Sequence, residues 1–237
     1  MPLPTIAVPN YQITLLSDGT KLKYRPFLVK EEKILHMAME SNDSQSQIDA
    51  MVDVIAACTD TDTKYIKGLP VFDIEYIFLQ IRAKSVGEIV KPMVKCTSCG
   101  ETVEANIDLT KIGSKKNKNH TNKIKLTDAG IGVVMRYPSI VIVGTSVSDA
   151  ENSQDLAVDI VVDCIEYIYD GEQMYKTSEC EKSEVVDFVD NLTKEQFEKI
   201  SDFFETMPKI KKDLKFKCPK CEKMNKIEIE GIENFFG

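Results

Sequence analysis

The chain has 237 residues, 43% apolar and 29% charged, and its 38 Asp and Glu against 30 Lys and Arg leave a net charge of −8. These values suit one large domain or two small ones and exclude a disordered tail. No run of about 18 apolar residues occurs, which excludes a bilayer-spanning helix, and the acidic balance disfavours general binding of nucleic acid or anionic lipid.

Strand and helix periodicities follow one another in the first 88 residues. Alternating apolar residues on both sides of the turn Ser17–Thr20 predict a β-hairpin, with Gly19 free to take a positive φ. Helical spacing of apolar residues then predicts helices at 30–41, 44–58 and 73–84. We expect Asp73 to be the N-cap of the third helix.

The rest of the chain alternates between the two periods again. A hairpin is expected at 89–112, a lysine-rich loop at 114–123, and short strands at 123–127 and 131–137. A second helical region is expected from about 152 to 207. It holds an apolar stripe from Ala157 to Ile168, a short helix near 183–190, and a helix opened by a capping box of Thr193 and Gln196. The last 25 residues return to strand alternation.

Cysteine spacing gives the strongest chemical signal. Cys96 and Cys99 form one C-x2-C pair, Cys218 and Cys221 a second, and each pair lies between two alternating strands. Two such turns facing each other make a tetrahedral four-sulfur cage, which Zn²⁺ fills with bonds of about 2.3 Å. Because 118 residues separate Cys99 from Cys218, we interpret the middle of the chain as an insertion into a split zinc ribbon. The metal is expected to join the two halves of this ribbon and so to stabilise the whole fold.

A redox pair and a catalytic zinc site are the alternative interpretations of these cysteines. Redox C-x-x-C motifs usually occur singly at a helix start, whereas these pairs lie on hairpins. A catalytic zinc usually has His or a carboxylate among its ligands, and neither His36 nor His120 flanks a pair. We expect His36 to be packed or on the surface and His120 to be solvated. Cys58 and Cys164 are expected to be structural, and Cys180 exposed.

The chain carries no motif of the common enzyme classes. It lacks a phosphate-binding P-loop, a dinucleotide fingerprint, a nucleophile elbow and a zinc-protease motif. The seven cysteines are an odd number in a chain without a visible signal peptide, which favours a reducing compartment over a disulfide scaffold. We therefore predict a protein that works in a reducing compartment, and its motifs indicate no enzyme class.

Charge is unevenly distributed along the chain. Residues 149–190 carry a net charge of −11, whereas residues 205–226, around the second cysteine pair, carry +5. The basic segment could contact nucleic acid, or its lysines could simply solvate an exposed hairpin. It has no arginine and no aromatic platform, which favours the second interpretation.

Two aromatic segments are candidates for partner contacts. The chain ends in Phe235-Phe236-Gly237, and a terminal pair of phenylalanines either packs into the protein's own core or binds a partner. Arg25-Pro26-Phe27 forms a corner after the first hairpin. Because arginine and aromatic residues dominate interface energetics, Arg25, Phe27, Phe235 and Phe236 are the predicted partner-binding residues.

Several long segments resemble one viral family. The stretch from Lys23 to Leu35, KYRPFLVKEEKIL, and the stretch from Phe72 to Gly87, FDIEYIFLQIRAKSVG, are similar to the T4-like bacteriophage baseplate hub assembly proteins. The blocks IKLT at 124–127 and GVVMRYP at 132–138, both cysteine pairs and the Phe-Phe-Gly ending are similar to the same family.

The resemblance implies a non-enzymatic protein that helps to build the central hub of a contractile tail's baseplate inside the infected bacterium, with other hub or tail proteins as partners. It supplies no catalytic residues and leaves open whether the protein stays in the virion. A nucleic-acid-binding zinc ribbon is the alternative function. We predict an α+β fold in three regions: a hairpin with three helices at 1–88, a split zinc-ribbon module at 89–112 and 213–237, and inserted strands with an acidic helical region at 113–212.

Overall fold

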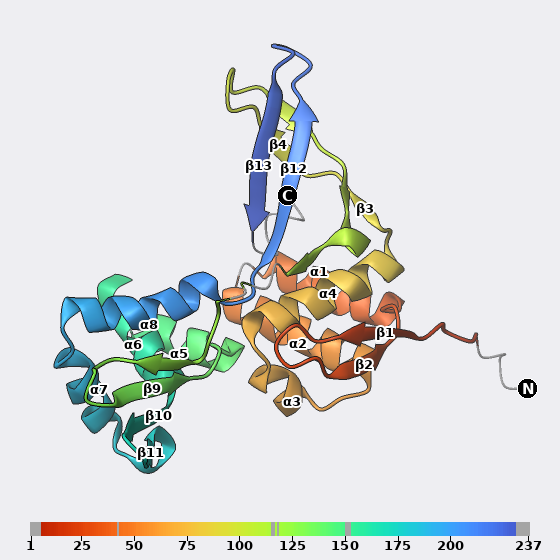
Figure 1. The fold of residues 1–237 in the computed structure, drawn as a ribbon. Helices are drawn as coiled ribbons and strands as arrows, with labels where there is room; N and C mark the ends of the chain where they lie inside the picture. Colours follow the sequence, from red (N-terminus) through yellow and green to blue (C-terminus); the bar gives the residue numbers. More distant parts are fainter. Residues whose placement is uncertain (1–5, 42, 115–116, 118, 150–152, 231–237) are drawn as a thin grey trace, which may run out of the picture. The chain divides into compact units, whose positions relative to one another are not determined.

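The computed structural model describes residues 6–41, 43–114, 117, 119–149 and 153–230. Helices and strands mix throughout, so the α+β class is confirmed (Figure 1). The chain divides into two compact units: residues 1–115 with 208–237 form the first, and residues 116–207 form the second. Among the described residues, no helix is long and apolar enough to cross a membrane.

The N-terminal part of the first unit is a hairpin followed by helices. The elements are β1 (Tyr11–Thr14), β2 (Lys21–Tyr24), α1 (Val29–Glu40), α2 (Ser44–Thr59), α3 (Thr63–Gly68) and α4 (Val71–Ser85). The hairpin and the three expected helices are confirmed. The short helix α3 was not expected from the sequence, and it begins where the Asp62 carboxylate accepts a hydrogen bond from the Lys64 N–H at 2.8 Å.

The expected role of Asp73 was wrong. Helix α4 begins at Val71 with Pro70 as its N-cap, so Asp73 is the third helical residue and is fully buried. Its Oδ1 accepts the backbone N–H of Leu16 at 2.7 Å, which ties the end of strand β1 to the helix. Burial raises the pKa of this carboxyl group, because the apolar surroundings disfavour its charged form.

The first unit is completed by strands from two distant parts of the sequence. These are β3 (Ile89–Val90), β4 (Met93–Lys95), β5 (Thr102–Glu104), β6 (Ile107–Asp108), β7 (Gly113–Ser114), β12 (Ile210–Lys217) and β13 (Met224–Glu230). Antiparallel pairing joins β3 to β6, β4 to β5, and β12 to both β7 and β13. One hydrophobic cluster includes Leu79 of α4, Ile107 of β6 and Leu214 of β12. The two hairpins that carry the cysteines, β4–β5 and β12–β13, therefore pack on the same hydrophobic core.

The second unit is a four-stranded antiparallel sheet with helices. Its strands are β8 (Lys123–Lys125), β9 (Ile131–Met135), β10 (Ile165–Asp170) and β11 (Gln173–Lys176), in the order β11-β10-β9-β8. Its helices are α5 (Ile140–Asp149), α6 (Ser153–Cys164), α7 (Lys182–Asp190) and α8 (Lys194–Thr206). The Thr193 capping box is confirmed, since the Thr193 hydroxyl accepts the Gln196 N–H and the Gln196 side chain accepts the Thr193 N–H.

The predicted apolar stripe from Ala157 to Ile168 was wrong over its second half. Helix α6 ends at Cys164, and Ile165 and Ile168 belong to strand β10. In that strand Ile168 lies opposite Val133 of β9, and Ile165 lies opposite Met135. Apolar residues three apart fit a helix, but pairing with a distant strand overrides this local pattern.

Gly132 gives a direct test of the packing in this sheet. A Cβ atom at this position would collide with the Tyr169 hydroxyl and the backbone oxygen of Ile124, two atoms that hydrogen-bond to each other at 3.1 Å. We expect Gly132→Ala to destabilise the protein by about 1–3 kcal/mol in urea unfolding followed by circular dichroism. Gly113→Ala, which meets no atom within 4 Å, is the matched control, and equal effects of the two substitutions would contradict this account.

Candidate metal centre

Two turns of the same shape carry the four cysteines. We call them the first knuckle, Cys96–Glu101, and the second knuckle, Cys218–Lys223; each is closed by a strand pair directly outside it. In the first knuckle the N–H of Cys96 donates to Glu101 O at 2.8 Å, and the N–H of Gly100 donates to Cys96 O at 3.0 Å. In the second the corresponding distances are 3.0 Å, from Cys218 N to Lys223 O, and 2.9 Å, from Glu222 N to Cys218 O.

The two knuckles also match in backbone conformation, because the fifth residue of each has a positive φ in the left-handed region. Gly100 has φ of 72°, and Glu222, at the equivalent position, has φ of 61°. A non-glycine residue in this region is uncommon because its Cβ crowds the backbone. The second knuckle therefore adopts the conformation of the first although its sequence lacks the glycine.

The two knuckles bring their sulfurs together. The Sγ atoms of Cys96, Cys99, Cys218 and Cys221 all lie within 4.8 Å of one another. The short distances run between the knuckles, 3.7 Å from Cys96 to Cys221 and 3.6 Å from Cys99 to Cys218. A tetrahedron with metal–sulfur bonds of about 2.3 Å has edges of about 3.8 Å, so the spacing fits a four-sulfur site for one ion.

Electrostatics within the cluster also favour a bound cation. Hydrogen bonds from the backbone N–H groups of Cys99 and Ser98 lower the pKa of Cys96 to about 6. A hydrogen bond from the Glu101 N–H lowers the pKa of Cys99. Partial desolvation and the sulfurs of Cys221, Cys218 and Cys96 outweigh it and raise this pKa to about 12. One thiolate thus forms readily and opposes a second, and a divalent cation would remove this conflict.

The donor set suits a structural site. Among the described residues, these four cysteines are the one group of His, Cys, Asp or Glu close enough to share an ion, and it contains no His or carboxylate. Cys96 and Cys218 are buried, Cys221 is half-buried and Cys99 is exposed. Four thiolates saturate a tetrahedral ion and leave no open position for a substrate.

The other cysteines lie apart from this cluster. Cys58 and Cys164 are buried, as expected, and burial raises the pKa of Cys58 to about 11 and that of Cys164 to about 12. Cys180, expected to be exposed, is half-buried against the core of the second unit. A buried thiol with a raised pKa is a poor nucleophile, so Cys58 and Cys164 have the character of packed apolar groups.

The expectation that His120 is solvated was wrong. Its ring is half-buried in the second unit, with Nδ1 2.9 Å from the Thr206 hydroxyl and Nε2 2.9 Å from the Tyr137 hydroxyl. The ring stacks on Tyr137 and tilts against Phe203, with centroids 5.6 Å and 5.0 Å away. The lysine-rich composition of the loop hides these partners, which come from distant positions. His36 is exposed, within the range expected for it.

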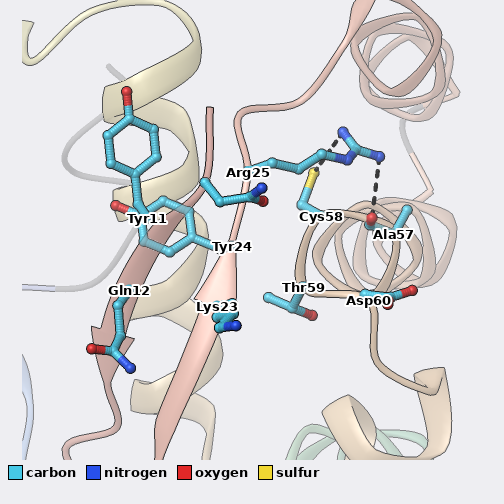
Figure 2. A pocket seen from close by; sticks show the side chains of 10 residues that line it. Tyr11, Gln12, Lys23, Tyr24, Arg25, Ala57, Cys58, Thr59 and Asp60 are labelled. Carbon is cyan, nitrogen blue, oxygen red and sulfur yellow. Dashed lines mark hydrogen bonds between the residues drawn. The ribbon is translucent and has the colours of Figure 1, made fainter. Parts of the chain in front are cut away.

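Arg25, a predicted partner-binding residue, makes several contacts inside the first unit. Figure 2 shows its guanidinium turned toward the Cys58 sulfur, 3.8 Å away, and the Ala57 carbonyl, 3.1 Å away, beside a surface hollow of about 720 Å³. It also donates to a Glu31 carboxylate oxygen at 2.9 Å. Arg25 therefore ties the start of helix α1 to the end of α2.

The other predicted anchors differ in what surrounds them. Phe27 is half-buried and lines a groove of about 450 Å³ together with residues of α1, α2 and α4. Phe235 and Phe236 lie outside the described residues. Asn225, a buried polar residue beside the second knuckle, was not predicted from the sequence; the signal for it is a break in the apolar alternation of β13.

The Arg25–Glu31 pair predicts a pH dependence of stability. Burial of Glu31 raises the pKa of its carboxyl group. Hydrogen bonds from Arg25 and the Leu28 N–H, with the charges of Arg25 and Lys30, outweigh burial and lower this pKa. Because the pKa of Glu31 is lower in the folded state, the carboxylate stabilises the fold at pH values above its unfolded-state pKa of about 4.3. This stabilisation is lost as the pH falls through the folded-state pKa. We expect Glu31→Gln to cost about 1.5–3 kcal/mol at pH 7 and much less at pH 3 in urea unfolding. An equal loss at both pH values would contradict this assignment.

Comparison with family models matches almost the whole chain to one family. A family model described as T4 bacteriophage base plate protein matches residues 8–237. Neither the curated proteins nor the solved structures include a significant match.

Proposed function

We propose that this chain, which belongs to the T4 bacteriophage base plate protein family, is a non-enzymatic assembly protein that helps to build the central hub of the base plate. Membership of the family implies contacts with other phage tail or base plate proteins. The proposed mechanism is binding: a zinc-clamped scaffold presents apolar and charged faces to other hub subunits in the cytoplasm of the infected bacterium.

The convergence of four sulfurs carries the structural half of this proposal. Cys96, Cys99, Cys218 and Cys221 would hold one Zn²⁺, whose chemistry here is to bond four thiolates and so fix the two knuckles of a split zinc ribbon. Strands β4 and β5, which carry the first knuckle, have three residues each. Hairpins this short are marginal in water, so the metal would supply stability that the strands lack.

Helix α1 supports the binding half of the proposal. None of its apolar residues is buried; Glu31 is its buried residue. Val29 is 66% exposed, Met37 71% and Met39 66%, and Met39 lines the same apolar groove as Phe27. A helix normally buries an apolar face, so this groove with the exposed face of α1 is a suitable seat for a base plate or tail protein.

The rival function, nucleic-acid binding, rests on the solvent face of the β12–β13 ribbon. Lys215 lies directly opposite Lys226, both are exposed, and like charges opposed across strands are destabilising unless an anion offsets them. The net charge of −8 and the lack of arginine in residues 205–226 count against this rival. Steep salt-dependent binding of duplex DNA by the purified chain would favour it over hub assembly.

Metal content tests the zinc site. We expect the purified chain to hold one zinc ion, and the double variant Cys96→Ser/Cys221→Ser to lose at least about tenfold in zinc affinity because two thiolates are gone. Its thermal midpoint should also fall. Elemental mass spectrometry and thermal unfolding measure the two effects. Cys180→Ser, outside the cluster, is the control and should keep its zinc. A wild-type chain without stoichiometric zinc would refute the site.

Truncation tests the predicted terminal anchor. Removing residues 232–237, which include Phe235 and Phe236, should abolish complex formation with other hub proteins and leave zinc in place. Native mass spectrometry of the chain co-expressed with its neighbouring tail genes reports partner, stoichiometry and metal together. Phe27→Ala, at the other candidate anchor, should weaken the same complexes. Unchanged partner binding in the truncated chain would refute the role of the terminal phenylalanines.

A further inference from the structure

One buried side chain links the two knuckles. Asn225, in strand β13, is 3% exposed. Its Oδ1 accepts hydrogen bonds from the Thr97 N–H at 2.9 Å and the Thr97 hydroxyl at 2.8 Å, in a turn 128 positions away in sequence. Its Nδ2 donates to the Lys223 carbonyl at 3.1 Å. That carbonyl also accepts the N–H of Cys218, so the bridge runs from one cysteine turn to the other.

The orientation of the Asn225 amide is fixed by backbone groups. The Thr97 N–H can only donate, so the amide oxygen must face the first knuckle. The Lys223 carbonyl can only accept, so the amide nitrogen must face the second. The Cys96 sulfur also lies 3.5 Å from Oδ1, but it donates only while protonated. When Cys96 becomes a thiolate, the two Thr97 bonds and the Lys223 bond still hold the bridge.

The position of Asn225 is unusual for its strand. Ile227 and Ile229 continue the same face of β13, and Ile229 belongs to the hydrophobic cluster at the ribbon's base. The alternation calls for an apolar residue at 225, and a buried polar side chain has a cost unless its hydrogen-bonding groups are satisfied. Here both halves of the amide are satisfied, by one partner in each knuckle.

We propose that Asn225 is a positioning residue of the metal centre: it holds the first knuckle against the second so that four sulfurs converge before an ion binds. This inference rests on the proposed zinc site. Groups that orient metal ligands without touching the metal commonly change metal affinity by about 10- to 100-fold when removed. The Asn225 amide would hold the two turns together before zinc binds. Zinc binding then has less chain to order, so less conformational entropy is lost on binding.

Zinc release from the full-length chain tests the proposal. The zinc-loaded protein is mixed with an excess of a chromogenic chelator, and the release rate is followed by absorbance. Asn225→Ala should release zinc about 10- to 100-fold faster than the wild type. Thr97→Val, which removes the hydroxyl bond and keeps the backbone one, should release zinc a few-fold faster and serves if Asn225→Ala does not fold.

Ile227→Ala is the matched control, because it lowers packing on the same face of β13 without removing a bond to either knuckle. It should lower the thermal midpoint while zinc release stays close to the wild-type rate. Unchanged release from Asn225→Ala and Thr97→Val, or equal acceleration by Ile227→Ala, would overturn the proposal and leave the zinc site intact. A wild-type chain that holds no zinc would overturn the site and this role together.

Discussion

The structure of the first unit depends on the meeting of two cysteine turns that are distant in sequence. Cys99 and Cys218 are 119 positions apart, and the second compact unit, residues 116–207, lies between them in the chain. Without an ion, the neighbouring sulfurs oppose the ionisation of Cys99 and raise its pKa to about 12. With a divalent cation, the same sulfurs would join two parts of the first unit that are distant in sequence.

This arrangement explains how short strands can belong to a stable unit. The paired strands β3 and β6 have two residues each, and β12 and β13 reach a common base with α4 through Ile210, Leu214 and Ile229. The apolar cluster fixes one end of the β12–β13 ribbon, and the proposed metal centre with Asn225 would fix the other. In helix α1, the apolar side chains of Val29, Ile34, Met37 and Met39 are exposed, as a surface for a partner would be.

Local patterns in the sequence predicted the features that depend on local physics. The apolar spacing of residues 44–58, the Thr193 capping box and the two C-x2-C turns each specify their own geometry within a few residues. The meeting of the two C-x2-C turns was also predicted, because one ion needs all four sulfurs, but other features that depend on distant partners escaped prediction. Ile165 and Ile168 follow helical spacing but pair with β9, and His120 rests on Tyr137 and Phe203. Asn225 breaks a strand pattern for a reason visible only when Thr97 lies beside it.

The nature of the metal centre can be measured directly by X-ray absorption spectroscopy at the zinc edge of the purified full-length protein. We expect one shell of four sulfur neighbours at about 2.3 Å, with no nitrogen or oxygen directly bonded to the metal. A first shell that contains light atoms, or fewer than four sulfurs, would contradict the convergence of Cys96, Cys99, Cys218 and Cys221 on a single ion.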